Sequence, residues 1–140
     1  MKKLFITGGC GYVGSLMIQK FLKKYTIQNV DTQWFGNKLV NNNNLTNIKE
    51  DIRNLSGEFI EKNTYAVVHL ANIANDPSVE LDQTLSWEVN VLAAKNLIEK
   101  SIKAGVKKFI YASSGSVYGV KREMKVTEDL DLVPISAYNK

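Results

Sequence analysis

The chain has 140 residues, of which 44% are hydrophobic and only 2 are proline, and 18 lysines and arginines stand against 14 acidic residues. This composition indicates one globular domain of α/β size and excludes a disordered tail, a collagen and a disulfide scaffold. No stretch approaches the roughly 20 uncharged apolar residues of a membrane span, and Met1-Lys2-Lys3 leads straight into a strand-like segment without the core of a signal peptide. We therefore expect a cytoplasmic protein, whose single cysteine, Cys10, can form no internal disulfide and no metal cluster.

The net charge of +4 is carried by basic pairs at expected helix ends and turns, namely Lys23-Lys24, Lys107-Lys108 and Lys121-Arg122. No interleaving of aromatic and basic residues accompanies these pairs, so they indicate a solvated surface rather than a nucleic-acid interface.

Apolar runs of strand length alternate with longer segments of helical spacing, which is typical of parallel strands joined by crossover helices. The expected strands are Lys3–Thr7, Ile27–Asp31, Asn47–Glu50, Ala66–Leu70 and Lys108–Ala112. The expected helices are Tyr12–Lys24, a short one near Glu58–Lys62, and Asp82–Ala104, closed by Gly105. The pattern predicts an α/β fold with a parallel sheet whose strands, Phe109–Ala112 included, are apolar on both faces.

The long expected helix has two apolar stripes. One consists of Leu85, Val89, Leu92 and Ala93, and the other, on nearly the opposite side, consists of Trp87, Val91, Ala94, Ile98 and Ile102. One stripe can cover the sheet, and the second needs another partner, which is either a further helix of a longer chain or a second subunit.

The strongest motif is the glycine turn from Thr7 to Gly14, with glycines spaced G-x-x-G-x-x-G between the first strand and the first helix. Gly8 permits a tight turn, Gly11 lets backbone N–H groups approach a pyrophosphate, and Gly14 lets the helix lie close to the strand. The phosphates would meet free N–H groups at the positive end of the helix dipole. We therefore assign Gly8, Gly11, Tyr12, Val13 and Gly14 to cofactor binding.

Asp31 lies 17 residues after Gly14, at the end of the second expected strand. A carboxylate there can accept hydrogen bonds from both ribose hydroxyls of an adenosine. It also repels a 2′-phosphate, which favours NAD over NADP. The alternative is an aspartate that only forms a turn. Asp51 and Ile52 follow the third expected strand and could contact adenine, although a surface aspartate has the same periodicity.

In these motifs the chain resembles the extended short-chain dehydrogenase/reductase family, which includes nucleotide-sugar epimerases, dehydratases and decarboxylases. The resemblance covers all 140 residues and rests on Thr7–Gly14, Asp31, Asp51-Ile52-Arg53, His69–Asn72, Asn90, Tyr111–Gly119 and Pro134–Lys140. It implies a Rossmann-type doubly wound parallel sheet, truncated before its last strands. Residues 1–140 would then be a partial N-terminal NAD-binding domain, without the C-terminal substrate region.

The resemblance also implies roles for single residues. Ser114 would hold the reacting sugar oxygen, and Tyr138 would be the acid and base of the reaction. Leu70, Ala71 and Asn72 would line the cofactor, and Asn90 would support the active site. On the residues alone, Ser114 could be an ordinary hydrogen-bonding residue at a strand end and Tyr138 a half-buried aromatic, and His69 is interpreted as a packing residue.

In the family, the tyrosine takes a proton from a sugar hydroxyl while hydride passes to NAD, and a lysine four residues later supports the tyrosine. That lysine would be residue 142. Lys140 would not replace it on a helix, because two residues turn about 200°. The resemblance therefore predicts a longer enzyme that is a homodimer at full length and takes a nucleotide-sugar substrate. It also predicts a 140-residue chain that binds NAD weakly and turns nothing over.

Within this class an epimerase is favoured over a dehydratase, because Ser113–Ser116 lacks the Asp-Glu pair of the family's 4,6-dehydratases. Ala74 stands where galactose epimerases have a lysine, so the particular sugar stays open. Two other classes remain as alternatives: a dinucleotide-binding module without catalysis, and an NADPH-dependent reductase of small carbonyl compounds. The reductase requires Asp31 to tolerate a 2′-phosphate.

Overall fold

A computed structural model describes residues 1–140 and contains one parallel sheet of five strands in the order β3-β2-β1-β4-β5. The strands are β1 (Lys2–Thr7), β2 (Tyr25–Asp31), β3 (Leu45–Lys49), β4 (Thr64–His69) and β5 (Lys108–Tyr111). β1 has β2 on one side and β4 on the other, so the chain winds first outward to β3 and then back past β1 to β5. This reversal confirms the doubly wound Rossmann-type sheet.

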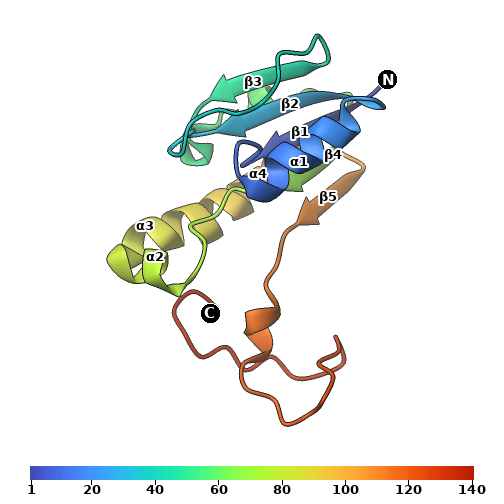
Figure 1. The fold of residues 1–140 in the computed structure, drawn as a ribbon. Coiled ribbons are helices and arrows are strands. Elements are labelled where there is room, and N and C mark those ends of the chain that lie inside the picture. The colour runs from blue at the N-terminus through green and yellow to red at the C-terminus, as the bar shows by residue number, and fades with distance from the viewer.

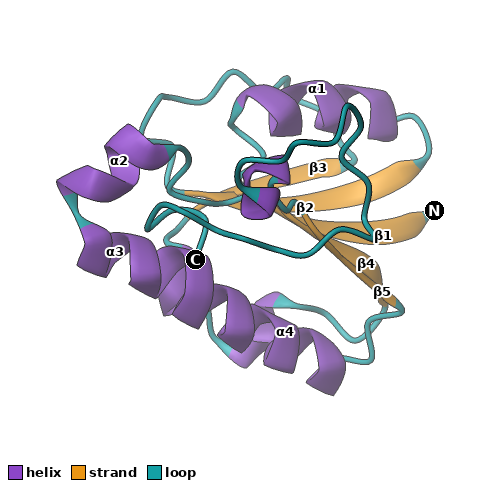
Figure 2. Ribbon diagram, turned by 90° about the horizontal axis from the view of Figure 1, so that it is seen from below, coloured by secondary structure: helices purple, strands orange, loops and turns teal.

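Helices cover both faces of the sheet, as Figure 2 shows. α1 (Tyr12–Phe21) packs on one face, and α3 (Gln83–Trp87) and α4 (Ala94–Lys103) lie along the other. Because neighbouring side chains of a strand point to opposite faces, Leu4 and Ile6 pack with α1 residues while Phe5 packs with the other helices. The core therefore consists of two clusters of buried apolar residues, separated by the sheet.

The long expected helix exists, but its middle is not a regular α-helix. A π-helical segment, Glu88–Ala93, joins α3 to α4, and the helix ends at Gly105 with a φ of +73°. In an α-helix, each step of four residues rotates the contact face by about 40°. The wider π turns offset this rotation, so Leu85, Val89, Ala93 and Leu97 all face the core.

The two predicted stripes of this helix are correct only in part. Leu92, placed on the same stripe as the buried Val89 and Ala93, is half exposed, and Ala94, placed on the other stripe, is buried. The remaining members of the second stripe are exposed or half exposed: Trp87, Val91, Ile98 and Ile102. Both errors come from treating the segment as uniformly α-helical.

Two further differences from the sequence analysis concern helices. The short helix expected near Glu58–Lys62 is only a 3-10 turn at Gly57–Phe59, preceded by another at Ile52–Asn54. A helix that was not expected, α2 (Asp76–Leu81), follows β4. Its signals are present in the sequence, because the side chain of Asn75 accepts a hydrogen bond from the Ser78 amide at 3.1 Å and Pro77 occupies the first turn.

β5 is one of the two edge strands of the sheet and is more exposed than expected. Ile110 and Tyr111 are about half exposed, so this strand is not buried, although its residues are apolar on both faces. After β5 the chain leaves the sheet and runs below it, with a 3-10 turn at Gly115–Tyr118 as its regular element, and ends near α2 and α3 (Figure 1). None of the helices combines the length and the apolar character that a membrane crossing requires.

Candidate functional site

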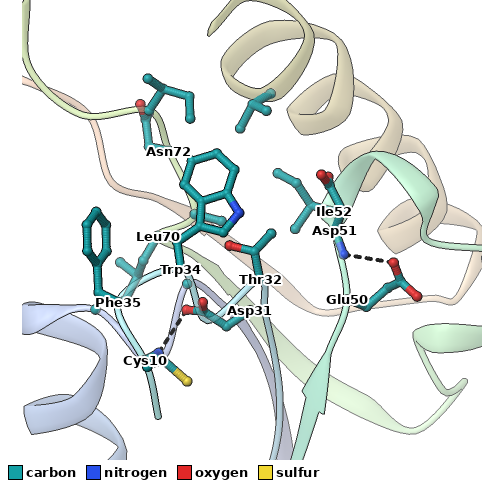
Figure 3. A pocket seen from close by; sticks show the side chains of 16 residues that line it. Cys10, Asp31, Thr32, Trp34, Phe35, Glu50, Asp51, Ile52, Leu70 and Asn72 are labelled. Atoms are coloured by element: carbon teal, nitrogen blue, oxygen red, sulfur yellow. Dashed lines mark hydrogen bonds between the residues drawn. The ribbon is translucent and has the colours of Figure 1, made fainter. Parts of the chain in front are cut away.

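A cavity of about 170 Å³ lies at the carboxyl ends of β1, β2 and β4 (Figure 3). In doubly wound sheets, ligands bind outside the carboxyl ends of the strands where the winding reverses, which is where this cavity lies. Eight of the residues predicted to bind a cofactor line it: Gly8, Gly11, Asp31, Asp51, Ile52, Leu70, Ala71 and Asn72. The other four, Tyr12, Val13, Gly14 and Asn90, do not.

Two glycines of the turn stand where no side chain fits. Gly8 has a φ of +76°, and a β-carbon added to it would lie 2.5 Å from the amide nitrogen of Ala71. A β-carbon added to Gly14 would lie 2.6 Å from the carbonyl oxygen of Gly8. The turn therefore lies directly against the segment after β4, and α1 lies directly against the turn.

The start of α1 has backbone donors without acceptors. The amides of Tyr12, Val13 and Gly14 donate to no carbonyl, and the first turn of α1 contains no acidic residue. Tyr12 and Val13 are 85% and 61% exposed, so their unpaired amides lie at the surface of the molecule beside the glycine turn. Free amides at the positive end of a helix dipole form a site suited to a phosphate.

Asp31 ends β2 and turns its carboxylate toward the glycine turn. One carboxylate oxygen, Oδ2, accepts a hydrogen bond from the Cys10 amide at 2.9 Å, and Oδ1 accepts one from the Gln33 amide at 2.7 Å. Each oxygen keeps a second lone pair, which can accept a ribose hydroxyl. Burial, together with the charge of Asp31, raises the pKa of the Cys10 thiol, so the thiol stays protonated at neutral pH.

Below the glycine turn lies a polar contact that the motif search did not identify. Asn29 is buried, and its Oδ1 accepts a hydrogen bond from the Gly9 amide at 2.9 Å. Its Nδ2 donates to Oδ1 of Asn47, its register partner on β3, at 2.7 Å. An asparagine within the buried run Ile27–Val30 was the available signal, since buried polar side chains need partners.

Asp51 is held by its neighbour Arg53. Its carboxylate accepts hydrogen bonds from the backbone amide of Arg53 at 2.8 Å and from the guanidinium, which also pairs with Glu88 at 2.6 Å. The hydrogen bond from the guanidinium lowers the pKa of Asp51 below its ordinary value. Ile52 is buried and contributes both to the core and to the cavity wall.

The segment after β4 is fixed by Asn90, which lies in the π-helical part of the long helix. Its side-chain amide accepts from the Ile73 amide at 2.8 Å and donates to the Ile73 carbonyl at 3.1 Å. Asn90 thus supports the cavity wall without lining it. Oδ1 of Asn72, which does line the cavity, is buried without a hydrogen-bond partner and is available to a donor on a ligand.

Ser114 and Tyr138 lie outside this cavity, in the segment that follows β5. Ser114 lines a second hollow with Tyr118 and Glu128. Oγ of Ser114 is 2.6 Å from Oγ of Ser116, which in turn donates to Asn139, the residue after Tyr138. The two predicted catalytic groups are thereby brought into one region but share no hydrogen bond.

Tyr138 lies in a turn rather than in a helix, so the helical argument about Lys140 does not apply to this structure. The pKa of Tyr111 is raised above its ordinary value, mainly by burial and to a smaller extent by the negative charge that Tyr138 would carry when ionised.

Sequence reasoning missed part of the cavity wall. Besides Cys10, the lining residues that it did not assign are Thr32, Trp34, Phe35, Gly36, Glu50, Ile73 and Val89. The signal that was present is the aromatic pair Trp34-Phe35, which begins three residues after Asp31.

A reversal of winding, a glycine turn and a carboxylate at the end of the second strand together define a dinucleotide-binding Rossmann-type domain. Residues 4–140 match the sequence model of the NAD dependent epimerase/dehydratase family. The chain belongs to this family.

Several known proteins are similar to the chain. A putative UDP-glucose 4-epimerase of Methanocaldococcus jannaschii is 30% identical over 139 residues, which are 96% of this chain and 46% of that protein. The structure of a UDP-N-acetylglucosamine 4-epimerase from Methanobrevibacter ruminantium, in complex with UDP-N-acetylmuramic acid, superposes with a TM-score of 0.93 at 30% identity, covering 99% of this chain and 46% of that one. The UDP-glucose 4-epimerase of Thermus thermophilus, solved with NAD, gives 0.84 at 27% identity, covering 98% and 46%. The chain thus spans about half the length of these relatives.

Proposed function

We propose that the chain binds NAD across the carboxyl ends of β2, β1 and β4, and that it is the N-terminal half of a nucleotide-sugar 4-epimerase. The observation that carries the proposal is the carboxylate of Asp31, held at 2.9 Å from the amide of Cys10 beside a glycine turn. The geometry fits a dinucleotide, because Gly8 and Gly14 leave no room for side chains and Oδ1 of Asn72 lacks a partner. Family membership and the named relatives support the choice of NAD and of a nucleotide sugar.

Different residues of the chain would bind different parts of the dinucleotide. The free amides at the start of α1 take the diphosphate, and Asp31 takes the adenosine ribose through its two oxygens. Leu70 and Ala71 form the wall next to β4, and Asn72 offers its unpaired oxygen to a hydroxyl of the ligand. Asp51 and Ile52 border the adenosine end.

For the reaction, NAD when bound supplies an acceptor for hydride, which lets a sugar hydroxyl be oxidised transiently. We assign the proton of that hydroxyl to the Tyr138 oxygen and a hydrogen bond to the same sugar oxygen to Oγ of Ser114. A positive charge near Tyr138 would favour its phenolate, and we expect a lysine at position 142 of the complete protein to supply it.

We infer two further properties of the complete protein. Val91, Ile98 and Ile102 form an exposed apolar stripe on the long helix, which fits the interface of a homodimer. We also expect the protein to act in the cytoplasm, where the unpaired Cys10 stays reduced.

Calorimetric titration of the chain tests the cofactor. We expect NAD to bind more tightly than NADP by about tenfold or more, which is the effect of about 1.4 kcal/mol of charge repulsion at the ribose. Asp31→Ala should weaken NAD binding and remove the preference, whereas Asp129→Ala, at an exposed position away from the cavity, should change neither. Equal or tighter binding of NADP by the unmodified chain would contradict the assignment and favour a carbonyl reductase.

The alternative of a binding module without catalysis has one observation in its favour, since Ser114 and Tyr138 share no hydrogen bond. Conversion of UDP-galactose to UDP-glucose separates the two functions. We expect conversion by the protein extended beyond residue 142, its loss in Tyr138→Phe, and none by residues 1–140. An extended protein that binds NAD but is inactive on nucleotide sugars would support the module.

A further inference from the structure

The turn that follows β2 carries two aromatic side chains on a defined backbone. Gln33 and Gly36 both have positive φ, at 57° and 85°, and the Gly36 amide donates to the Gln33 carbonyl at 2.9 Å. The turn is attached to the proposed ribose-binding residue, because the Gln33 amide donates to Oδ1 of Asp31 at 2.7 Å. Trp34 and Phe35 are therefore placed relative to Asp31 by hydrogen bonds of the backbone.

Neither aromatic ring belongs to the hydrophobic core. Trp34 is 59% exposed and Phe35 is 92% exposed, and both line the cavity. Figure 3 shows the indole of Trp34 standing in the cavity between Ile52 and Asn72, whereas the ring of Phe35 stands at its side near Leu70. A large indole left half in water gains free energy when a flat apolar partner covers it.

The place of Trp34 in the sheet identifies which part of a dinucleotide it would meet. The turn comes from β2, on the side of β1 away from β4 and β5. Asp31 on the same strand would hold the adenosine ribose, and Ser114 and Tyr138, which follow β5, would mark the reacting end. The base next to Asp31 is therefore the adenine, and the aliphatic Ile52 lines the same cavity as the indole (Figure 3).

We propose that Trp34 is the adenine-stacking residue of this site, with Ile52 against the other face of the base. This inference rests on the proposed dinucleotide function and adds to it an aromatic contact for the base. Stacking recognises any flat base, and the choice of adenosine comes from the neighbouring Asp31 carboxylate, which takes the attached ribose. The tryptophan thus supplies affinity and the aspartate supplies selection.

The chain contains only two tryptophans, which makes the proposal directly measurable. In Trp87→Phe, Trp34 is the only indole, and its fluorescence is followed while ADP-ribose, AMP or nicotinamide mononucleotide is added. We expect ADP-ribose and AMP to quench the emission and nicotinamide mononucleotide, which lacks adenine, to leave it unchanged.

Affinity gives an independent readout. Trp34→Ala should raise the Kd for ADP-ribose about 5- to 100-fold, the range found when base-stacking aromatics are replaced by alanine. Trp34→Phe should retain most of the affinity, and Trp87→Phe, which alters the other half-exposed indole outside the cavity, should retain all of it. An unchanged melting temperature of unliganded Trp34→Ala shows that the fold is intact.

The outcomes separate this inference from the function on which it rests. Binding of ADP-ribose by the original chain with an unchanged Kd in Trp34→Ala overturns the stacking role alone. Quenching by nicotinamide mononucleotide equal to that by AMP also overturns it, because the indole would then meet the other base. Absence of any binding of ADP-ribose or NAD to the original chain overturns the proposed function and the stacking role together.

Discussion

The glycine turn could be predicted from the sequence because its backbone leaves no room for a β-carbon at certain positions, where only glycine fits. Gly8 and Gly14 must lack a β-carbon, since one would lie 2.5 Å from Ala71 and 2.6 Å from the Gly8 carbonyl, respectively. Gly57, by contrast, has open space around it and carries no such requirement. The spacing of glycines thus predicts the position of the turn, whereas the side chain below it, Asn29, is visible only as a polar residue in an apolar strand.

His69 is a residue whose environment determines its charge. Its ring is 2% exposed, Oγ1 of Thr7 lies 2.6 Å from Nδ1, and Nε2 has no partner. Burial lowers the pKa of His69 from 6.5 to about 4. The rings of Phe109 and Tyr111 lie next to it, which agrees with the packing role expected from the sequence.

The lowered pKa makes stability depend on pH. Below pH 6.5 the unfolded chain binds a proton at His69 that the native chain does not bind until about pH 4. As the pH is lowered from 6.5 to about 4, the free energy of unfolding should therefore fall by about 3 kcal/mol in total because of this residue. His69 is the only histidine of the chain, so its proton NMR signals report the native pKa without ambiguity. A midpoint near 6.5 in the folded protein would contradict the prediction, and His69→Gln should remove this part of the pH dependence.

At the scale of elements, regular spacing predicted all five strands and the long helix, because burial imposes a period of two or of about 3.6. It could not predict the π-helical segment, since the choice between α and π turns depends on contacts with other parts of the chain. Asn90 shows one such contact, with its amide bound to both backbone groups of Ile73. Its supporting role was implied only by the resemblance to a family.

The contact between Asn90 and Ile73 can be measured. Asn90→Leu leaves a partly buried amide and carbonyl of Ile73 without partners, which should lower the free energy of unfolding by about 1–3 kcal/mol. Amide exchange at Ile73 should accelerate, and NAD binding should weaken because the segment after β4 lines the cavity. Asn96→Leu on α4 changes the same side chain at a position that makes no side-chain hydrogen bond, and it serves as the control. Equal effects of the two substitutions would show that Asn90 has no special role.

At the scale of the molecule, the alternation of strands and helices predicted a parallel sheet, since parallel strands joined by helices allow few topologies, and the resemblance to a family implied its doubly wound order. Residues 112–140 were less accessible to this reasoning. They contain one 3-10 turn and have mostly exposed side chains, so neither periodicity nor burial constrains them. The two predicted catalytic residues, Ser114 and Tyr138, belong to this segment, which is why their relation could be predicted only from the resemblance.

NAD should stabilise the folded chain as a whole and should protect the cavity more than the segment that follows β5. At a concentration of NAD 100 times its Kd, the free energy of unfolding should rise by about 2.7 kcal/mol, because only the folded chain binds. Hydrogen exchange should slow at the glycine turn, in the turn after β2 and at Leu70–Ile73, where the cavity lies. Residues 120–132, which do not line that cavity, should exchange as before. Asp31→Ala at the same NAD concentration provides the control for weakened binding. Slower hydrogen exchange at Ser114 with no change at the glycine turn would place the dinucleotide elsewhere on the molecule.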